Sequence, residues 1–191
     1  MKEKTLRNTK FKMCKLCKTK PVYEFTNQRK LCKACFIHWF EKKFLYTIRK
    51  FNMIRFGNIV GYENKGDFRG VVLEEVLRMF AKKSMIELVK LPTKKKVDKN
   101  AIPSTTDLEA DKIIHFLIKR KPKKFGSAVE KKIIKPLYLF LDKEILIYAK
   151  LKNLKFGKIS GSKDKISDFI DELEEKHPEV KQAVVKSFLV D

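Results

Sequence analysis

The sequence has 191 residues and is strongly basic, with 45 Lys and Arg against 23 Asp and Glu and a formal net charge of +22. Hydrophobic residues make up 43% of the chain, which excludes a wholly disordered protein. No apolar run reaches the roughly 18 residues of a membrane-spanning helix, and the N-terminus lacks the apolar core of a signal peptide. We therefore expect a folded, cytoplasmic protein with no membrane segment.

The positive charge is unevenly distributed along the chain. Residues 1–56 carry 16 basic and 3 acidic side chains, and residues 82–135 carry 16 and 6, whereas residues 136–191 carry 10 of each. A uniformly lysine-rich composition would not leave the C-terminal quarter neutral. Clustered cations favour a polyanionic partner such as nucleic acid, because each phosphate contact releases counterions.

Four cysteines, the only ones in the chain, form two Cys-x-x-Cys pairs: Cys14, Cys17, Cys32 and Cys35. This spacing is a strong zinc signal, because two tight knuckles can complete a tetrahedral shell of four thiolates. A closed shell has no open position for substrate, so we expect a structural zinc ion. Disulfides would need an oxidising compartment. Iron could occupy the same sulfurs, and His38 could replace one cysteine as a ligand.

The elements follow in chain order from hydrophobic periodicity. Residues 18–31, between the two cysteine pairs, have the composition of a short hairpin. From Phe36 an apolar stripe recurs at three- and four-residue steps, which predicts a helix with one apolar and one cationic face. The remaining expected elements are a strand at 57–61, a loop at 62–67, a helix around 71–80, a strand at 85–91, a polar connection at 92–103, a helix over 108–119, an extended segment at 133–137, and helices over 141–151, 165–175 and 180–188.

Strand and helix alternation of this kind predicts an α/β layer with a small sheet of two or three strands. Ser104 or Thr105 is a candidate N-cap for the helix over 108–119, with Ile113, Ile114, Leu117 and Ile118 facing inward. The densest cationic block, residues 119–124, follows that helix on a loop that Pro122 favours.

We interpret the cations of the cysteine module, the following helix and the 119–124 block as candidate RNA-binding residues. They are Lys15, Lys18, Arg29, Lys30, Lys33, Lys43, Arg49, Lys119, Arg120, Lys121, Lys123 and Lys124. Tyr23, Phe25 and Trp39 could stack on unpaired bases, although Phe25 and Trp39 fit a local core better.

Several stretches carry a family resemblance. They are the double knuckle with its following helix, the Ile-Lys-Pro-Leu run at 134–137, the run at 168–178, and a weaker match at 106–111, which resembles an Asn-Leu-Asp-Asp-Glu segment. In these stretches the chain resembles the two-thiouridine synthetase (TtuA-like) family of tRNA 2-thiolation enzymes, within the ATP-pyrophosphatase (PP-loop) superfamily. The resemblance covers about half of the chain.

The chain departs from the family pattern at two sites. Family members bind ATP through a Ser-Gly-Gly-Lys-Asp-Ser loop, whereas this chain has Glu-Asn-Lys-Gly-Asp-Phe at 63–68. The corresponding vestigial nucleotide loop would comprise Gly61, Lys65, Gly66 and Asp67. The family also uses three further cysteines for an iron–sulfur cluster or for catalysis, and this chain has none outside its two pairs. We therefore expect neither productive ATP binding nor an iron–sulfur cluster, and no catalytic residues.

The resemblance implies a zinc ribbon-like module at 1–36, a linking basic helix at 37–56, and a reduced PP-loop ATP-pyrophosphatase-like (HUP) domain at 57–191. It also implies a shortened, degenerate and non-catalytic member that binds tRNA, either with a full-length catalytic thiolation subunit or as a homodimer. Two alternatives remain open. One is an active ATP-dependent tRNA sulfurtransferase with an altered loop, and the other is a general zinc-containing RNA- or protein-binding module.

Overall fold

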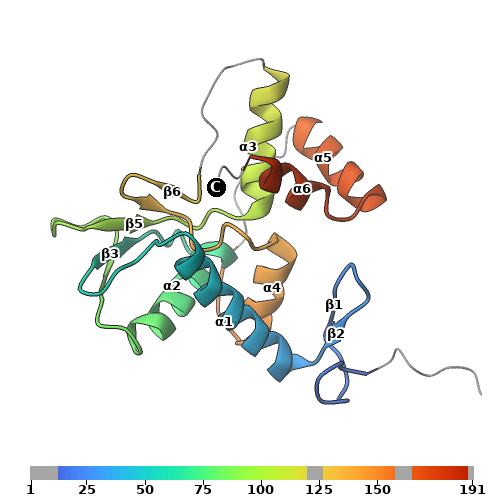
Figure 1. The fold of residues 1–191 in the computed structure, drawn as a ribbon, viewed down its shortest axis with the longest axis horizontal. Coiled ribbons are helices and arrows are strands. Elements are labelled where there is room, and N and C mark those ends of the chain that lie inside the picture. Colours follow the sequence, from blue (N-terminus) through green and yellow to red (C-terminus); the bar gives the residue numbers. More distant parts are fainter. Residues whose placement is uncertain (1–12, 120–126, 158–164, 189–191) are drawn as a thin grey trace, which may run out of the picture.

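The computed structural model describes residues 13–119, 127–157 and 165–188 of the chain (Figure 1). The helices are α1 (Lys33–Lys50), α2 (Phe68–Ala81), α3 (Thr106–Ile118), α4 (Asp142–Leu151), α5 (Lys165–Lys176) and α6 (Val180–Ser187). The strands are β1 (Tyr23–Glu24), β2 (Lys30–Leu31), β3 (Ile59–Tyr62), β4 (Glu87–Lys90), β5 (Lys99–Ala101), β6 (Val129–Glu130) and β7 (Ile133–Ile134). The architecture is mixed α/β with a parallel sheet, as the sequence predicted.

The N-terminal module is a short antiparallel hairpin followed directly by α1. Strands β1 and β2 pair with Tyr23 opposite Leu31, and Cys32 occupies the N-cap position of α1. The predicted hairpin is therefore confirmed. Figure 1 shows the hairpin separated from the main sheet by α1 and α4.

The main sheet has five strands in the order β4-β3-β5-β7-β6, more than the two or three expected. Strand β3 pairs in parallel with β4 on one side and with the central strand β5 on the other, and β6 pairs antiparallel with β7 at the edge. Strand β5 lies inside the predicted polar connection. Its sequence, Lys-Asn-Ala, contains one apolar residue, Ala101, which is fully buried. A single apolar position gives no alternating pattern from which a strand could be predicted.

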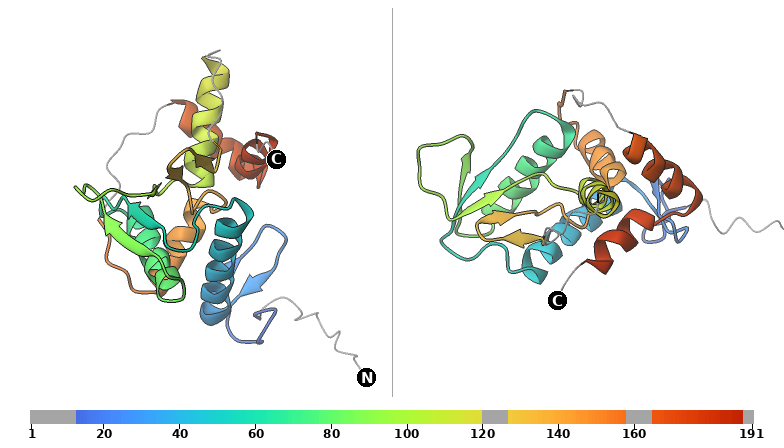
Figure 2. Two further views of the ribbon diagram at one scale, coloured as in Figure 1. Left: turned by 60° about the vertical axis from the view of Figure 1, so that its left-hand side comes forward. Right: turned by 90° about the horizontal axis from the view of Figure 1, so that it is seen from above.

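Two groups of helices pack beside the sheet. Helix α2 packs against β4 and α4, and α4 packs in turn against α1, whereas α3 packs against α5 and α6 (Figure 2). Leu117 and Ile118, expected to face inward from α3, are 52% and 55% exposed because the end of that helix extends past its packing partners. Within the described ranges, no helix combines the length and apolar character needed to cross a membrane.

Aromatic side chains on α1 join the hairpin to the core of the α/β layer. Phe36, Phe40 and Phe44 have no exposed surface, as the predicted stripe requires. The Phe40 ring stacks on Tyr148 of α4, with ring centroids 4.1 Å apart, and lies 4.4 Å from Phe140. Because Phe40 contacts two rings of the C-terminal half, α1 is held in place by residues far from it in sequence.

Truncation of Phe40 is expected to destabilise the protein strongly. Phe40→Ala removes a fully buried ring and leaves a cavity, so the free energy of unfolding should fall by about 3–5 kcal/mol. Urea denaturation followed by circular dichroism measures this change. Phe56→Ala is the matched control, because Phe56 is 79% exposed, and its effect should stay within roughly 0.5 kcal/mol. Equal losses in both variants would contradict the proposed role of Phe40.

Candidate metal centre and the carboxyl edge of the sheet

The structure brings the four cysteines together in one cluster. The sulfur atoms of Cys14, Cys17, Cys32 and Cys35 all lie within 4.8 Å of one another, with Cys17 and Cys32 separated by 3.3 Å and Cys17 and Cys35 by 3.6 Å. Their proximity means that the two pairs could act together as one ligand set for a metal. His38, the alternative ligand, is exposed on α1 and does not belong to this group.

Backbone hydrogen bonds shape the first knuckle. The N–H group of Cys14 donates to the carbonyl of Thr19, and the N–H group of Lys18 donates back to the carbonyl of Cys14. Lys18 has a φ of 60°, which closes this turn. A hydrogen bond from the Thr19 side chain, joined by one from the Cys35 backbone, lowers the pKa of Cys32 to about 6. Cys32 is therefore biased toward the thiolate, the form that binds metals.

Some of the predicted RNA-binding cations lie on the surface. Lys15, Lys18, Lys33, Arg49 and Lys119 are exposed. Lys15, Lys18 and Lys33 flank the cysteines, whereas Arg49 lies in the last turn of α1. Arg120, Lys121, Lys123 and Lys124 lie outside the described residues.

The other predicted cations are engaged within the protein. Lys43 pairs with the buried Glu144 at 2.8 Å, and only 20% of its side chain is exposed. Burial lowers the pKa of Lys43 even though Glu144 opposes this effect. Arg29 lies over the Phe25 ring, 4.2 Å from its centroid, and Lys30 pairs with Glu24. These three cations stabilise the module, whatever else they bind.

The loop predicted to be a vestigial nucleotide loop lies between β3 and the N-terminus of α2. Asp67 is the N-cap of α2, and its carboxylate accepts a hydrogen bond from the Gly70 N–H group. Asn64 accepts a hydrogen bond from the Gly66 N–H group, and Gly66 adopts a φ of 83°. The Asp67 carboxylate therefore lies at the N-terminus of α2, the helix end that favours anions.

This loop also lies at a topological switch point of the sheet. The strand that follows β3 in the sequence, β4, lies on one side of it, and the next strand, β5, lies on the other. The crevice outside the carboxyl ends of such strands is the usual ligand site of open α/β sheets. In this protein, charged side chains that pair with one another occupy the surroundings of this edge.

Glu109 and Lys135 form the most buried ion pair among the described residues. Their side chains are 3% and 5% exposed, and Glu109 Oε2 lies 3.0 Å from Lys135 Nζ. Glu109 also accepts hydrogen bonds from Ser104 and Lys112. Burial alone would raise the pKa of Glu109, but the hydrogen bonds from Lys112 and Ser104 and the charge of Lys135 hold it below its usual range.

Sequence reasoning did not single out this pair. Glu109 belongs to the segment at 106–111 and Lys135 to the Ile-Lys-Pro-Leu run, two of the stretches that carry the family resemblance. The structure therefore places two separate matches in direct contact. Both segments match the same family, and this was the signal in the sequence that could have predicted a contact between Glu109 and Lys135.

A second series of polar contacts joins the N-terminal ends of four helices. Arg69 in α2 forms a bidentate ion pair with Asp142 in α4. The Asp142 N–H group donates to Asp107 in α3 at 2.7 Å, and Asp107 accepts from Lys181 Nζ at 2.9 Å. These contacts tie α2, α3, α4 and α6 together beside the carboxyl edge.

No family model matches the sequence, and no curated protein matches it. Among solved structures, the U34-tRNA thiolase NcsA from Methanococcus maripaludis with its [4Fe-4S] cluster superposes with a TM-score of 0.76. The chain shares the fold of that thiolase. The match covers 93% of this chain and 86% of the thiolase chain at 18% sequence identity.

This similarity corrects the cofactor prediction. We expected a structural zinc ion and considered an iron–sulfur cluster unlikely. However, a protein with the same fold carries a [4Fe-4S] cluster, and this chain gathers four cysteines in one place. Four cysteine thiolates are an established ligand set for iron–sulfur clusters. The donor chemistry therefore fits a cluster, and the prediction that excluded it is wrong.

Metal content should depend on the cysteines and not on His38. Cys14→Ser and Cys32→Ser each remove one thiolate, so bound metal should be lost, since an incomplete shell binds weakly. Iron, zinc and acid-labile sulfide are measured after anaerobic purification. The control, His38→Ala, should retain the metal of the wild-type protein. Retention in the cysteine variants, or an absence of metal from the wild-type protein, would contradict the proposed site.

The Glu109–Lys135 pair should matter most at neutral pH. Glu109→Gln leaves a buried lysine with only Glu130 as an ionic partner, so the free energy of unfolding at pH 7 should fall by about 3 kcal/mol. Glu109 has a lowered pKa in the folded state, so its contribution is present above its unfolded pKa of about 4.3 and is lost as the pH falls through the lower folded value.

Urea denaturation of both proteins between pH 7 and pH 3 measures this dependence. The difference between wild type and variant should shrink at the acidic end. Glu87→Gln is the matched control, because Glu87 pairs with Lys95 on the surface with 50% of its side chain exposed. Its effect should remain below about 1 kcal/mol at every pH. A constant difference for Glu109→Gln across the pH range would show that its charge is not responsible.

Proposed function

We propose that this chain is a tRNA-binding relative or partner subunit of the enzymes that 2-thiolate wobble uridine in tRNA. The observation that carries the proposal is the fold shared with a U34-tRNA thiolase over 93% of the chain. The resemblance at the double knuckle and at the Glu109 and Lys135 segments supports the same family. The family assignment itself forms part of the proposal.

The charge distribution supports RNA as the ligand. The net charge of +22 is concentrated in the first 56 residues and in the middle of the chain. The exposed cations around the cysteine cluster, Lys15, Lys18 and Lys33, are available to phosphates. The cysteine module would then present these cations in a fixed arrangement, and the block at 119–124 would add a second contact.

The carboxyl edge supports a binding role rather than catalysis. A phosphate approaching the N-terminus of α2 would meet the Asp67 carboxylate, which already accepts the Gly70 N–H group. Glu109, Lys135, Arg69 and Asp142 are committed to ion pairs. We propose that this chain binds tRNA while a full-length thiolation subunit, or a second copy of this chain, completes the assembly.

The four cysteines would hold the cofactor of this chain. Following the thiolase of the same fold, we propose that their occupant is an iron–sulfur cluster, with Cys14, Cys17, Cys32 and Cys35 as its ligands. A cluster of this kind would fix the hairpin against α1, since Cys32 and Cys35 lie at the start of that helix.

Binding of tRNA should weaken with salt and depend on the cationic block. Replacing Lys119, Arg120, Lys123 and Lys124 with Gln should reduce the slope of log K against log salt concentration by between about 2.8 and 3.6, if each residue contacts one phosphate. Fluorescence anisotropy with labelled tRNA at several salt concentrations measures the slope. An unchanged slope would remove the block from the interface.

A control of equal charge separates location from net charge. Lys131, Lys132, Lys143 and Lys176 are four exposed lysines elsewhere on the surface, and the corresponding Gln variant has the same net charge as the test variant. Its slope should remain close to that of the wild-type protein. If the wild-type protein shows no salt-dependent tRNA binding at all, the proposed function fails.

A further inference from the structure

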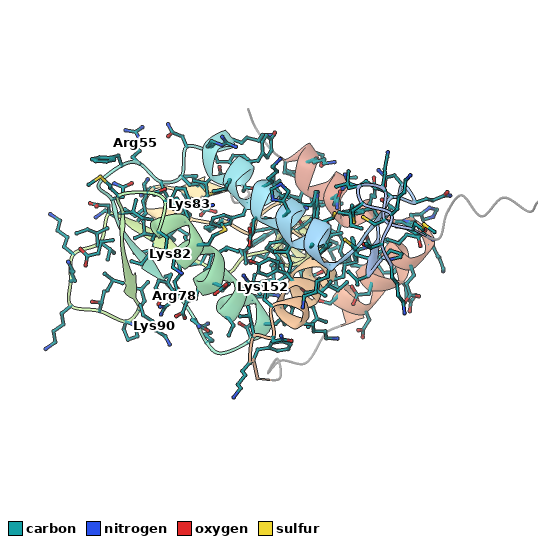
Figure 3. The ribbon with its side chains drawn as sticks, turned by 90° about the horizontal axis from the view of Figure 1, so that it is seen from below. Arg55, Arg78, Lys82, Lys83, Lys90 and Lys152 are labelled. Atoms are coloured by element: carbon teal, nitrogen blue, oxygen red, sulfur yellow. The ribbon has the colours of Figure 1, made fainter. Side chains whose placement is uncertain are left out.

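Six cations that the sequence analysis did not select gather on one face of the molecule (Figure 3). We call this surface the α2–β4 cationic face. It comprises Arg55, Arg78, Lys82, Lys83, Lys90 and Lys152. These residues come from the loop before β3, the C-terminal part of α2 and the turn after it, strand β4, and the residue that follows α4.

The face encloses a hollow with a partly apolar floor. The hollow has a volume of about 590 Å³, and Tyr62, Met79 and Leu88 contribute to its lining. Arg78, Lys82 and Lys152 line it as well. This volume lies within the range of about 300–1,000 Å³ that is usual for ligand pockets. A groove of this kind, with cations around an apolar base, suits the backbone and bases of a nucleic acid.

Few of the positive charges on this face are neutralised. Glu74 and Glu75 are the acidic side chains that pair here, Glu74 with Arg78 at 2.6 Å and Glu75 with Lys152 at 3.2 Å. Arg55, Lys82, Lys83 and Lys90 form no ion pair within the part of the chain that the structure describes. Four cations therefore remain available to an external polyanion.

Local structural roles explain only part of this arrangement. Lys82 and Lys83 follow the last turn of α2, where positive charge complements the helix dipole. However, Arg55 lies in a loop and Lys90 in an edge strand, and neither position is near that helix end in sequence. Lys90 pairs in register with Tyr62, so its side chain projects on the side of the sheet that carries the hollow.

We propose that the α2–β4 cationic face is a second RNA-binding surface, which holds a stretch of phosphate backbone across α2 and β4. This inference rests on the proposed function and extends it, because none of the six residues belongs to the cysteine module or to the 119–124 block. Helix α2 packs beside α1, which carries Arg49 in its last turn.

The test removes two unpaired charges from this face and two from elsewhere. The double variant Lys83→Gln, Lys90→Gln is compared with Lys131→Gln, Lys132→Gln. All four lysines are exposed, and the control pair lies in the turn between β6 and β7, at the opposite edge of the sheet from β4. Both variants lose the same net charge, and circular dichroism verifies that each is folded.

Anisotropy with labelled bulk tRNA is measured for both variants and the wild-type protein over a range of salt concentrations. If the inference holds, Lys83→Gln, Lys90→Gln reduces the slope of log K against log salt by about 1.4–1.8, which corresponds to two lost phosphate contacts. The control should leave the slope unchanged. Identical slopes for both variants and the wild-type protein would overturn the inference but leave the proposed function intact.

Two further outcomes are distinguishable. If the wild-type protein binds no tRNA, both the inference and the proposed function fail. A surface for an acidic protein would instead bind polyglutamate, and Lys83→Gln, Lys90→Gln would weaken that binding without affecting tRNA. That result would also overturn the inference, because it assigns the face to a protein partner.

Discussion

The contact between Phe40 and the rings of Tyr148 and Phe140 is the interaction on which the arrangement of this protein depends. A small cysteine module has little apolar surface of its own, so it cannot hold a fixed position by packing alone. Helix α1 solves this problem because its first turn carries Cys35 and its buried face inserts into the core that α4 completes. Tyr23 and Phe25 extend the same aromatic cluster into the hairpin, so the cysteine cluster and the α/β layer share one continuous core.

The carboxyl edge of the sheet is organised by charge instead. Burying the Glu109–Lys135 pair carries a desolvation cost, and hydrophobic residues of similar size would often be at least as stable. The ion pairs instead constrain how the helices are oriented relative to one another. Arg69, Asp142 and Asp107 connect the starts of three helices, and each contact requires one relative placement of those helices. The edge where an open α/β sheet normally receives its ligand is therefore fixed by the side chains of the chain itself.

The sequence was sufficient for features with strong local signals. The hairpin, the stripe on α1 and the Thr105 cap of α3 follow from spacing and periodicity, and the structure confirms them. Strand β5 was missed because three residues at the centre of a sheet need no alternating pattern. Lys43 looked like a surface cation because the sequence does not reveal Glu144, which lies 101 residues away. An iron–sulfur cluster was wrongly considered unlikely because zinc and iron–sulfur clusters use the same thiolate ligands.

Helix α1 is a single uninterrupted element of 18 residues, which corresponds to a length of about 27 Å. One end begins at the cysteine cluster, and the other carries Arg49 and Lys50 beside α2. Because the helix is continuous, its exposed cations share one backbone frame with the cysteine cluster at its start. In the proposed role, the hairpin would be ordered when the cluster is occupied, so that entropic cost would precede RNA binding. Occupation of the cysteine cluster would then act as preorganisation for RNA without any contact between the two ligands.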